Sequence, residues 1–183
     1  MEASISFRCG PYLLAPACDS MTVAWESNSH CRAFVSLATG DGPFCPPIEV
    51  PAVADTPVFQ GAQMALYRWT LEGLEPETDY RYRVELEGGE HLTAGFRTLP
   101  KNPEQLRLMT LSDSHAFATR ESFNQAVWTH RPCFILHSGD LVEGTGAQAE
   151  QFAYFLKGQD EQDFIHWFPV LYAEGNHDQG GPY

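Results

Sequence analysis

The 183-residue chain is poor in basic residues, with 11 Lys and Arg against 24 Asp and Glu and a formal net charge of −13. Nucleic-acid binding depends on clustered Lys and Arg that contact phosphates, so we do not expect it as the main role. Charged residues make up only 19% of the chain and hydrophobic residues 43%, a composition typical of a folded globular protein. The length suits one medium domain or two small ones.

Long hydrophobic runs are also missing. The longest apolar stretches, residues 12–18 and 167–173, are far shorter than the roughly 20 residues of a membrane-spanning helix, and prolines interrupt both. Glu2 precedes the first stretch and no basic segment begins the chain, so we expect no signal peptide. These absences predict a cytoplasmic protein that makes no membrane contact.

Cys-x-x-Cys pairs, which hold metals or carry out redox chemistry, are absent. The five cysteines are odd in number, and free thiols in a reducing compartment fit this pattern best. One or two disulfides among the first 45 residues are the alternative.

The first half of the chain alternates between apolar and polar residues. In residues 80–87, Tyr, Tyr, Val and Leu occupy every second position, and Arg or Glu the positions between. Such alternation predicts antiparallel strands with one buried face. Turn-forming Gly and Pro segments separate the strands, so we predict an all-β sandwich of about seven short strands. Tyr80 is a candidate to bond the backbone at a corner of this sandwich.

The second half changes character after a proline-bracketed polar linker at residues 99–105. Residues 106–111, 133–137 and 169–173 are compact apolar runs, which are typical of parallel strands covered on both faces.

Helical patterns lie between these runs. Apolar residues and a histidine recur at helical spacing after the first run, and residues 147–157 and 160–168 are compatible with helices after the second. The predicted order is therefore βαβαβ. The first helical stripe consists of Phe123, Ala126, Val127 and His130.

Each apolar run ends in a polar cluster. Ligands of an open parallel sheet bind beyond the carboxyl ends of its strands, which lie about 4.8 Å apart, so we expect the three clusters to share one crevice. Their oxygen and imidazole donors suit Mn, Fe or Zn in a hydrolytic site better than a structural zinc site. Taken singly, each Asp or Asn could instead be a turn or cap residue. The clusters are Asp113-Ser114-His115, Gly139-Asp140 and Gly175-Asn176-His177-Asp178.

In this order, the three clusters resemble the signature of the calcineurin-like metallophosphoesterase superfamily. Residues 11–13, 20–25 and 71–80 are similar to the fibronectin type III-like N-terminal domain of purple acid phosphatases. The resemblance implies a two-domain protein. Residues 1–98 would form the fibronectin type III-like β-sandwich, 99–105 the linker, and 106–183 the N-terminal part of an α/β metallophosphoesterase domain, the first half of its four-layer α/β sandwich.

The resemblance also implies an activity, the hydrolysis of phosphate mono- or diesters by a hydroxide that bridges two metal ions. The ions would be divalent or trivalent Fe, Mn or Zn. The competing hypothesis is a non-catalytic binding or interaction module with a degenerate phosphoesterase remnant. The implied roles are first-metal ligands for Asp113 and His115, a bridging ligand for Asp140, a second-metal ligand for Asn176, a proton donor to the leaving group for His177, and orientation of that histidine for Asp178.

Two departures from the family pattern change these expectations. Glu143 stands where purple acid phosphatases carry an iron-binding tyrosine, and His115 where they usually have Gly, so we predict no purple colour. The family's later histidines, one isolated and then a Gly-His-x-His motif, do not occur before Tyr183. We therefore expect an N-terminal part of a longer protein, with weak metal binding and little activity on its own. Neither the natural substrate nor the oligomeric state follows from the sequence.

Overall fold

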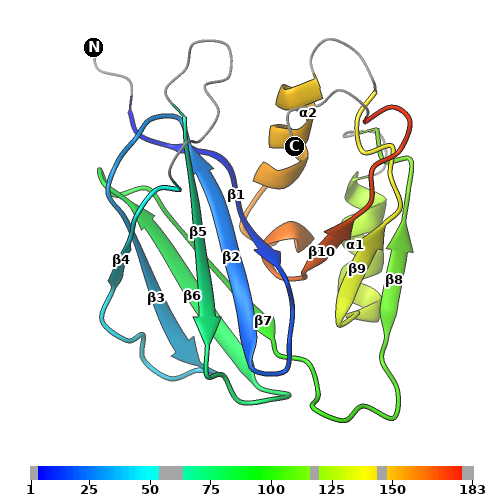
Figure 1. Ribbon diagram of the computed structural model, residues 1–183, viewed down its shortest axis with the longest axis horizontal. Coiled ribbons are helices and arrows are strands. Elements are labelled where there is room, and N and C mark those ends of the chain that lie inside the picture. The colour runs from blue at the N-terminus through cyan, green and yellow to red at the C-terminus, as the bar shows by residue number, and fades with distance from the viewer. Residues whose placement is uncertain (1–3, 54–63, 116–119, 144–147, 179–183) are drawn as a thin grey trace.

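The structure, a computed structural model, describes residues 4–53, 64–115, 120–143 and 148–178 (Figure 1). Its first seven strands form two antiparallel sheets, ordered β1-β2-β5 and β4-β3-β6-β7. This agrees with the alternating pattern of the sequence. The strands are β1 (Phe7–Leu14), β2 (Ser20–Ser27), β3 (Ala33–Thr39), β4 (Ile48–Val50), β5 (Ala65–Glu72), β6 (Asp79–Leu86) and β7 (His91–Arg97).

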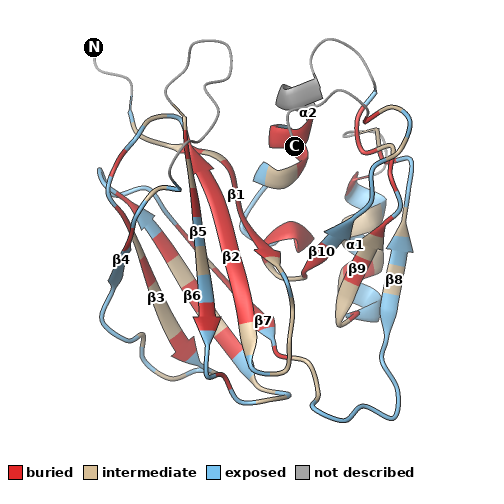
Figure 2. Cartoon of the chain, in the orientation of Figure 1, coloured by how far each residue is buried: buried red, intermediate tan, exposed pale blue. Residues whose placement is uncertain are grey.

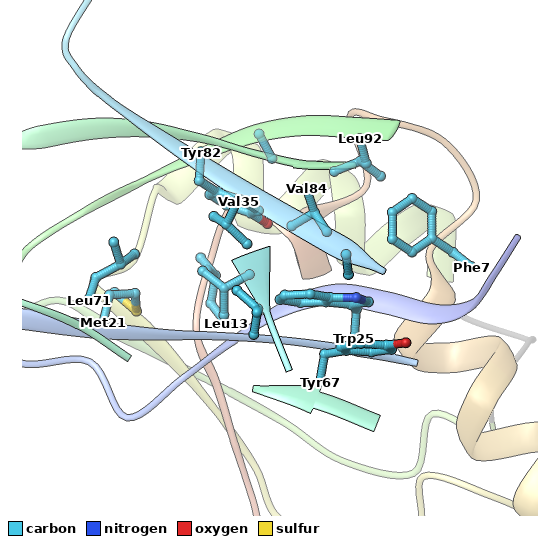
Figure 3. Close-up of a cluster of buried hydrophobic side chains, with 14 of the residues drawn as sticks. Phe7, Leu13, Met21, Trp25, Val35, Tyr67, Leu71, Tyr82, Val84 and Leu92 are labelled. Atoms are coloured by element: carbon cyan, nitrogen blue, oxygen red, sulfur yellow. The ribbon is translucent and has the colours of Figure 1, made fainter. Parts of the chain in front are cut away.

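The two antiparallel sheets share one apolar core. Its centre is Trp25 of β2, whose ring stacks on that of Tyr67 of β5 with 5.3 Å between the centroids (Figure 3). On β6 every second residue points into this core, as the period of two requires. The hydroxyl of Tyr80 accepts a hydrogen bond of 2.9 Å from the backbone N–H of Glu75, which confirms the expected corner contact. All five cysteines are free thiols.

The second half forms a parallel sheet in the order β10-β9-β8, and helices connect its strands. The βαβαβ order matches the prediction, although each strand is shorter than its apolar run. Neither helix of the described residues has the length and apolarity that crossing a membrane requires. The elements are β8 (Leu108–Leu111), α1 (Arg120–His130), β9 (Phe134–His137), α2 (Gln148–Lys157), the 3-10 helix η1 (Phe164–His166) and β10 (Val170–Tyr172).

The helix expected over residues 160–168 is reduced to the single turn of η1. Asp160 and Asp163 are the cause, because their carboxylates accept hydrogen bonds from nearby backbone N–H groups and so compete with helix formation. Asp163 is also held by a buried ion pair with Arg120, the first residue of α1. The turn is therefore fixed by a tertiary contact that the local pattern does not contain.

The expectation that the parallel strands are covered on both faces is wrong for this chain. Ile135 and Val170 pack against the helices, but on the opposite face Leu108 is 46% exposed and Leu171 is 37% exposed. Figure 2 shows the exposed residues of β8 in pale blue. Strands that follow one another in sheet order, joined by right-handed crossovers, carry their helices on the same face. Within the described residues the other face remains open.

The two halves of the chain pack directly on each other. Strand β1 lies against α2 and η1, and Cys9 and Tyr12 join the apolar core of the second half. Two hydrogen bonds cross the contact: the Tyr82 hydroxyl donates to the carbonyl of His166, and His166 Nδ1 bonds the carbonyl of Pro11. The parallel sheet is thus held at one side of the antiparallel sheets, and its strand ends are left accessible.

Candidate metal centre

The loops that follow β8, β9 and β10 interlock at the carboxyl ends of the strands. The backbone N–H of Asp113 donates to the carbonyl of Gly139 (3.2 Å), and that of His115 to the carbonyl of Asp140 (3.3 Å). The third loop joins through His177, whose N–H donates to Asp140 Oδ1 at 2.9 Å. The structure therefore brings the three sequence-distant clusters into one place, as the sequence predicts.

Two glycines make this close approach possible. A Cβ atom at Gly139 would lie 2.6 Å from the Cα of Gly175, and one at Gly175 would lie 2.3 Å from Asp140 Oδ1. Gly139 also has a φ of 110°, a conformation that side chains with a Cβ disfavour. Glycine is thus required at both positions for the backbones of the second and third loops to touch.

Asp178 holds the second and third loops together. It is buried, and its carboxylate accepts hydrogen bonds from the N–H groups of Asp140 (2.7 Å), Leu141 (3.0 Å), Val142 (3.2 Å) and Gly175 (2.8 Å). Burial alone would raise the pKa of this carboxyl group, but hydrogen bonds from the Tyr172 hydroxyl and from these backbone groups lower it. The residue therefore stays ionised.

The orientation of His177 by Asp178 stays a prediction. Both carboxylate oxygens of Asp178 accept hydrogen bonds from the backbone, and the imidazole Nδ1 of His177 lies 3.1 Å from the carbonyl oxygen of Glu143. The backbone of Glu143 is therefore a further group that contacts the His177 ring. The hydrogen bond to that carbonyl, reinforced by nearby carboxylates, raises the pKa of His177. The sequence pattern marks Glu143 only as a departure from the family, because a backbone acceptor leaves no trace in residue type.

Three of the four expected metal ligands have strained backbones. Asp113, His115 and Asp140 have φ values of 50°, 44° and 53°, in the left-handed region that non-glycine residues rarely adopt. Strain of this kind costs about 1–3 kcal/mol for each residue and collects at functional sites. The loops thus hold these residues in conformations that they would not adopt by themselves.

The loops at these strand ends carry acidic side chains, and their donor atoms are suited to a cation. Within the described parts of the chain, no Lys or Arg forms an ion pair with Asp113, Asp140 or Asp178. The Nδ1 atom of His115 is buried and makes no hydrogen bond among the described residues, although Glu143 Oε2 lies 3.5 Å away. Carboxylates without a Lys or Arg partner, and an imidazole nitrogen that makes no hydrogen bond, are the kind of donors that Mn, Fe or Zn take.

The side chains of the expected ligands lie farther apart than the backbones of the loops that carry them. Among the described residues, no three His, Cys, Asp or Glu side chains converge as they would around one metal ion. The rings of His115 and His177 meet edge to face with 5.4 Å between their centroids, whereas Asn176 is exposed.

A cavity of about 500 Å³ lies elsewhere, near the amino ends of the parallel strands, where Trp128 and Trp167 line it.

No family model matches the chain, and no curated protein matches it in sequence. Among solved structures, the chain is similar to the purple acid phosphatase PPD1 from yellow lupin (Lupinus luteus) seeds, with a TM-score of 0.65 and 20% identity over 95% of this chain and 35% of that one. It is also similar to PhoD, with a TM-score of 0.69 and 14% identity over 100% of this chain and 41% of that one. The chain thus spans less than half the length of either structure, and the similarity is one of fold.

Proposed function

We propose that this chain carries part of a metal-dependent phosphoesterase that hydrolyses phosphate mono- or diesters. The observation that carries the proposal is the set of left-handed turns at Asp113, His115 and Asp140, in loops that interlock beyond three parallel strands. Ala15, Glu77 and Arg131 also have positive φ values, so the proposal depends on the coincidence of these turns with the sequence motifs, which is typical of a functional site. Similarity of fold to a purple acid phosphatase and to PhoD supports the same conclusion.

The domain arrangement belongs to this proposal. Residues 1–98 would be a fibronectin type III-like domain, 99–105 the linker, and 106–183 the N-terminal part of an α/β metallophosphoesterase domain. The two antiparallel sheets and the backbone contact of Tyr80 support the first assignment. The parallel sheet supports the last, and its open apolar face is where further layers of a longer protein would pack.

In the proposed site, Asp113 and His115 would hold one metal ion, Asn176 would hold a second through its amide oxygen, and Asp140 would be a ligand of both. When bound, Fe, Mn or Zn ions would supply Lewis acidity and lower the pKa of water. The chain's own contribution is to position these donors on three loops that are hydrogen-bonded to one another. Asp178 and the two close-packed glycines keep the loops in place.

His177 is the proposed proton donor to the leaving-group oxygen. Its Nδ1 atom faces the Glu143 carbonyl, so this nitrogen carries a proton. The raised pKa of His177 keeps more of the ring protonated near neutral pH than an ordinary histidine would be.

A metal titration combined with hydrolysis assays tests the proposal. The chain is titrated with Mn²⁺ and Zn²⁺ by calorimetry, and hydrolysis of a chromogenic phosphomonoester and a diester is followed with and without metal. We expect weak metal binding and little turnover by the wild type, and Asp140→Asn should abolish both, because an amide bridges two cations poorly. Asp41→Asn, an exposed residue of the antiparallel half, is the control and should behave as the wild type.

The non-catalytic alternative is favoured by one observation, that no three ligating side chains converge among the described residues. In that case the antiparallel sheets would recognise a partner and the parallel half would be a remnant. Wild-type protein that takes up neither metal would support this alternative and refute the phosphoesterase proposal.

A further inference from the structure

Ser114 lies between the two expected ligands of the first loop and points the opposite way. Asp113 is exposed, whereas Ser114 is only 2% exposed. Its Oγ atom donates to the carbonyl of Leu141 at 3.4 Å and lies 3.1 Å from Nε2 of His137. The hydroxyl therefore connects the first loop to both the strand and the loop that carry Asp140.

His137, the last residue of β9, supplies the other half of this contact. It is 1% exposed, and the N–H of Gly139 donates to its Nδ1 atom at 3.3 Å. A nitrogen that accepts a hydrogen bond carries no proton, so the neutral ring bears its proton on Nε2 and donates it to Ser114. The rings of Phe155 and Tyr172, with centroids 5.8 Å and 5.9 Å away, hold the imidazole from two sides.

With this pair included, the N–H groups of residues 139–142 and the carbonyl groups of residues 139–141 all have hydrogen-bond partners. The N–H of Gly139 bonds His137, and the next three N–H groups bond Asp178. The carbonyl groups of residues 139, 140 and 141 accept from Asp113, His115 and Ser114 in turn. The hydroxyl of Ser114 thus makes one of the three hydrogen bonds by which residues 113–115 of the first loop contact residues 139–141 of the second.

We infer that Ser114 and His137 are a positioning pair for the proposed metal centre. The inference rests on the proposed function. The pair keeps Ser114 buried between Asp113 and His115. The side chains of these two flanking residues are thereby held at a fixed distance from Asp140. Without it, the two left-handed residues can relax toward ordinary backbone conformations, and ligands that relax must be reordered when a cation binds.

The test measures Mn²⁺ affinity by calorimetry on the full chain. Loss of a residue that orients ligands typically weakens metal binding by about 10- to 100-fold, and we expect this range for Ser114→Ala and His137→Asn, since the Asn side chain cannot reach Ser114. His137→Gln should fall between them and the wild type, since its amide N–H can still donate to Ser114 although the acceptor for the N–H of Gly139 is lost. Two matched controls should bind as the wild type: Ser138→Ala, an exposed serine that also bonds a carbonyl, and His130→Gln, an exposed histidine at the far end of α1.

The outcomes separate the two proposals. Wild-type protein that binds no Mn²⁺ refutes the metal centre, and the positioning pair falls with it. Equal affinity in the wild type, Ser114→Ala and His137→Asn overturns the pair alone. A ¹⁵N NMR spectrum of the wild-type histidines gives a readout that needs no variant to fold: a proton on Nε2 of His137 is expected, and a proton on Nδ1 would overturn the inference.

Discussion

Replacing Gly139 by alanine tests the claim that the backbones of the second and third loops must touch. The new Cβ would lie 2.5 Å from the backbone nitrogen of Gly175 and 2.6 Å from its Cα, and the φ of 110° at this position is unfavourable for alanine. Backbone strain of this kind costs about 1–3 kcal/mol. The overlap involves backbone that cannot rotate away, and it adds about 1–3 kcal/mol.

Gly88 provides a matched control for Gly139→Ala. It has a similar φ of 103°, but a Cβ there meets nothing within 4 Å. Gly88→Ala should therefore cost only the backbone strain, about 1–3 kcal/mol. The free energy of unfolding of both variants is measured by urea denaturation, followed by tryptophan fluorescence and circular dichroism. If Gly139→Ala is no more destabilising than Gly88→Ala, the close contact between the loops is not real.

Two further predictions concern stability at acidic pH and the open face of the parallel sheet. Burial lowers the pKa of His166, so the unfolded chain takes up its proton first, and the free energy of unfolding should be level above about pH 6.5 and fall below it. His166→Asn, which can still bond Pro11, should flatten that fall in urea titrations, and an unchanged slope would contradict the assignment. Leu108→Lys and Leu171→Glu should reduce binding of an apolar fluorescent dye and change the free energy of unfolding by less than about 0.5 kcal/mol, because both side chains are exposed. Ile135→Ala, on the covered face, should cost about 2–5 kcal/mol, and equal costs on the two faces would refute the reasoning.

Much of the fold is predictable because it depends on local periodicity. The alternation over residues 80–87 appears as β6, and the helical stripe that contains Val127 appears as α1. The segment 160–168 departs from its pattern because Asp163 pairs with Arg120, which lies 43 positions earlier in the chain. Periodicity cannot register a contact of that sequence separation.

The candidate site divides in the same way. Residue types and their order mark Asp113, His115, Asp140 and the 175–178 segment, because donors at strand ends are visible in the sequence. The supporting groups are not marked there: the Glu143 carbonyl faces His177, and His137 joins Ser114 to Gly139. Each of these depends on where a backbone group or a buried side chain lies in space.

The amino-acid sequence by itself determined most of the strands and helices, residues 160–168 excepted, and which residues stand at the ends of the parallel strands, since both follow from patterns a few residues long. Only the tertiary structure decided that the Asp178 carboxylate accepts from four backbone N–H groups, and that one face of the parallel sheet is open within the part of the chain that the structure describes. The physical reason is that hydrogen-bond partners and burial depend on distances in space. Strand order and packing set these distances, whereas spacing along the chain does not.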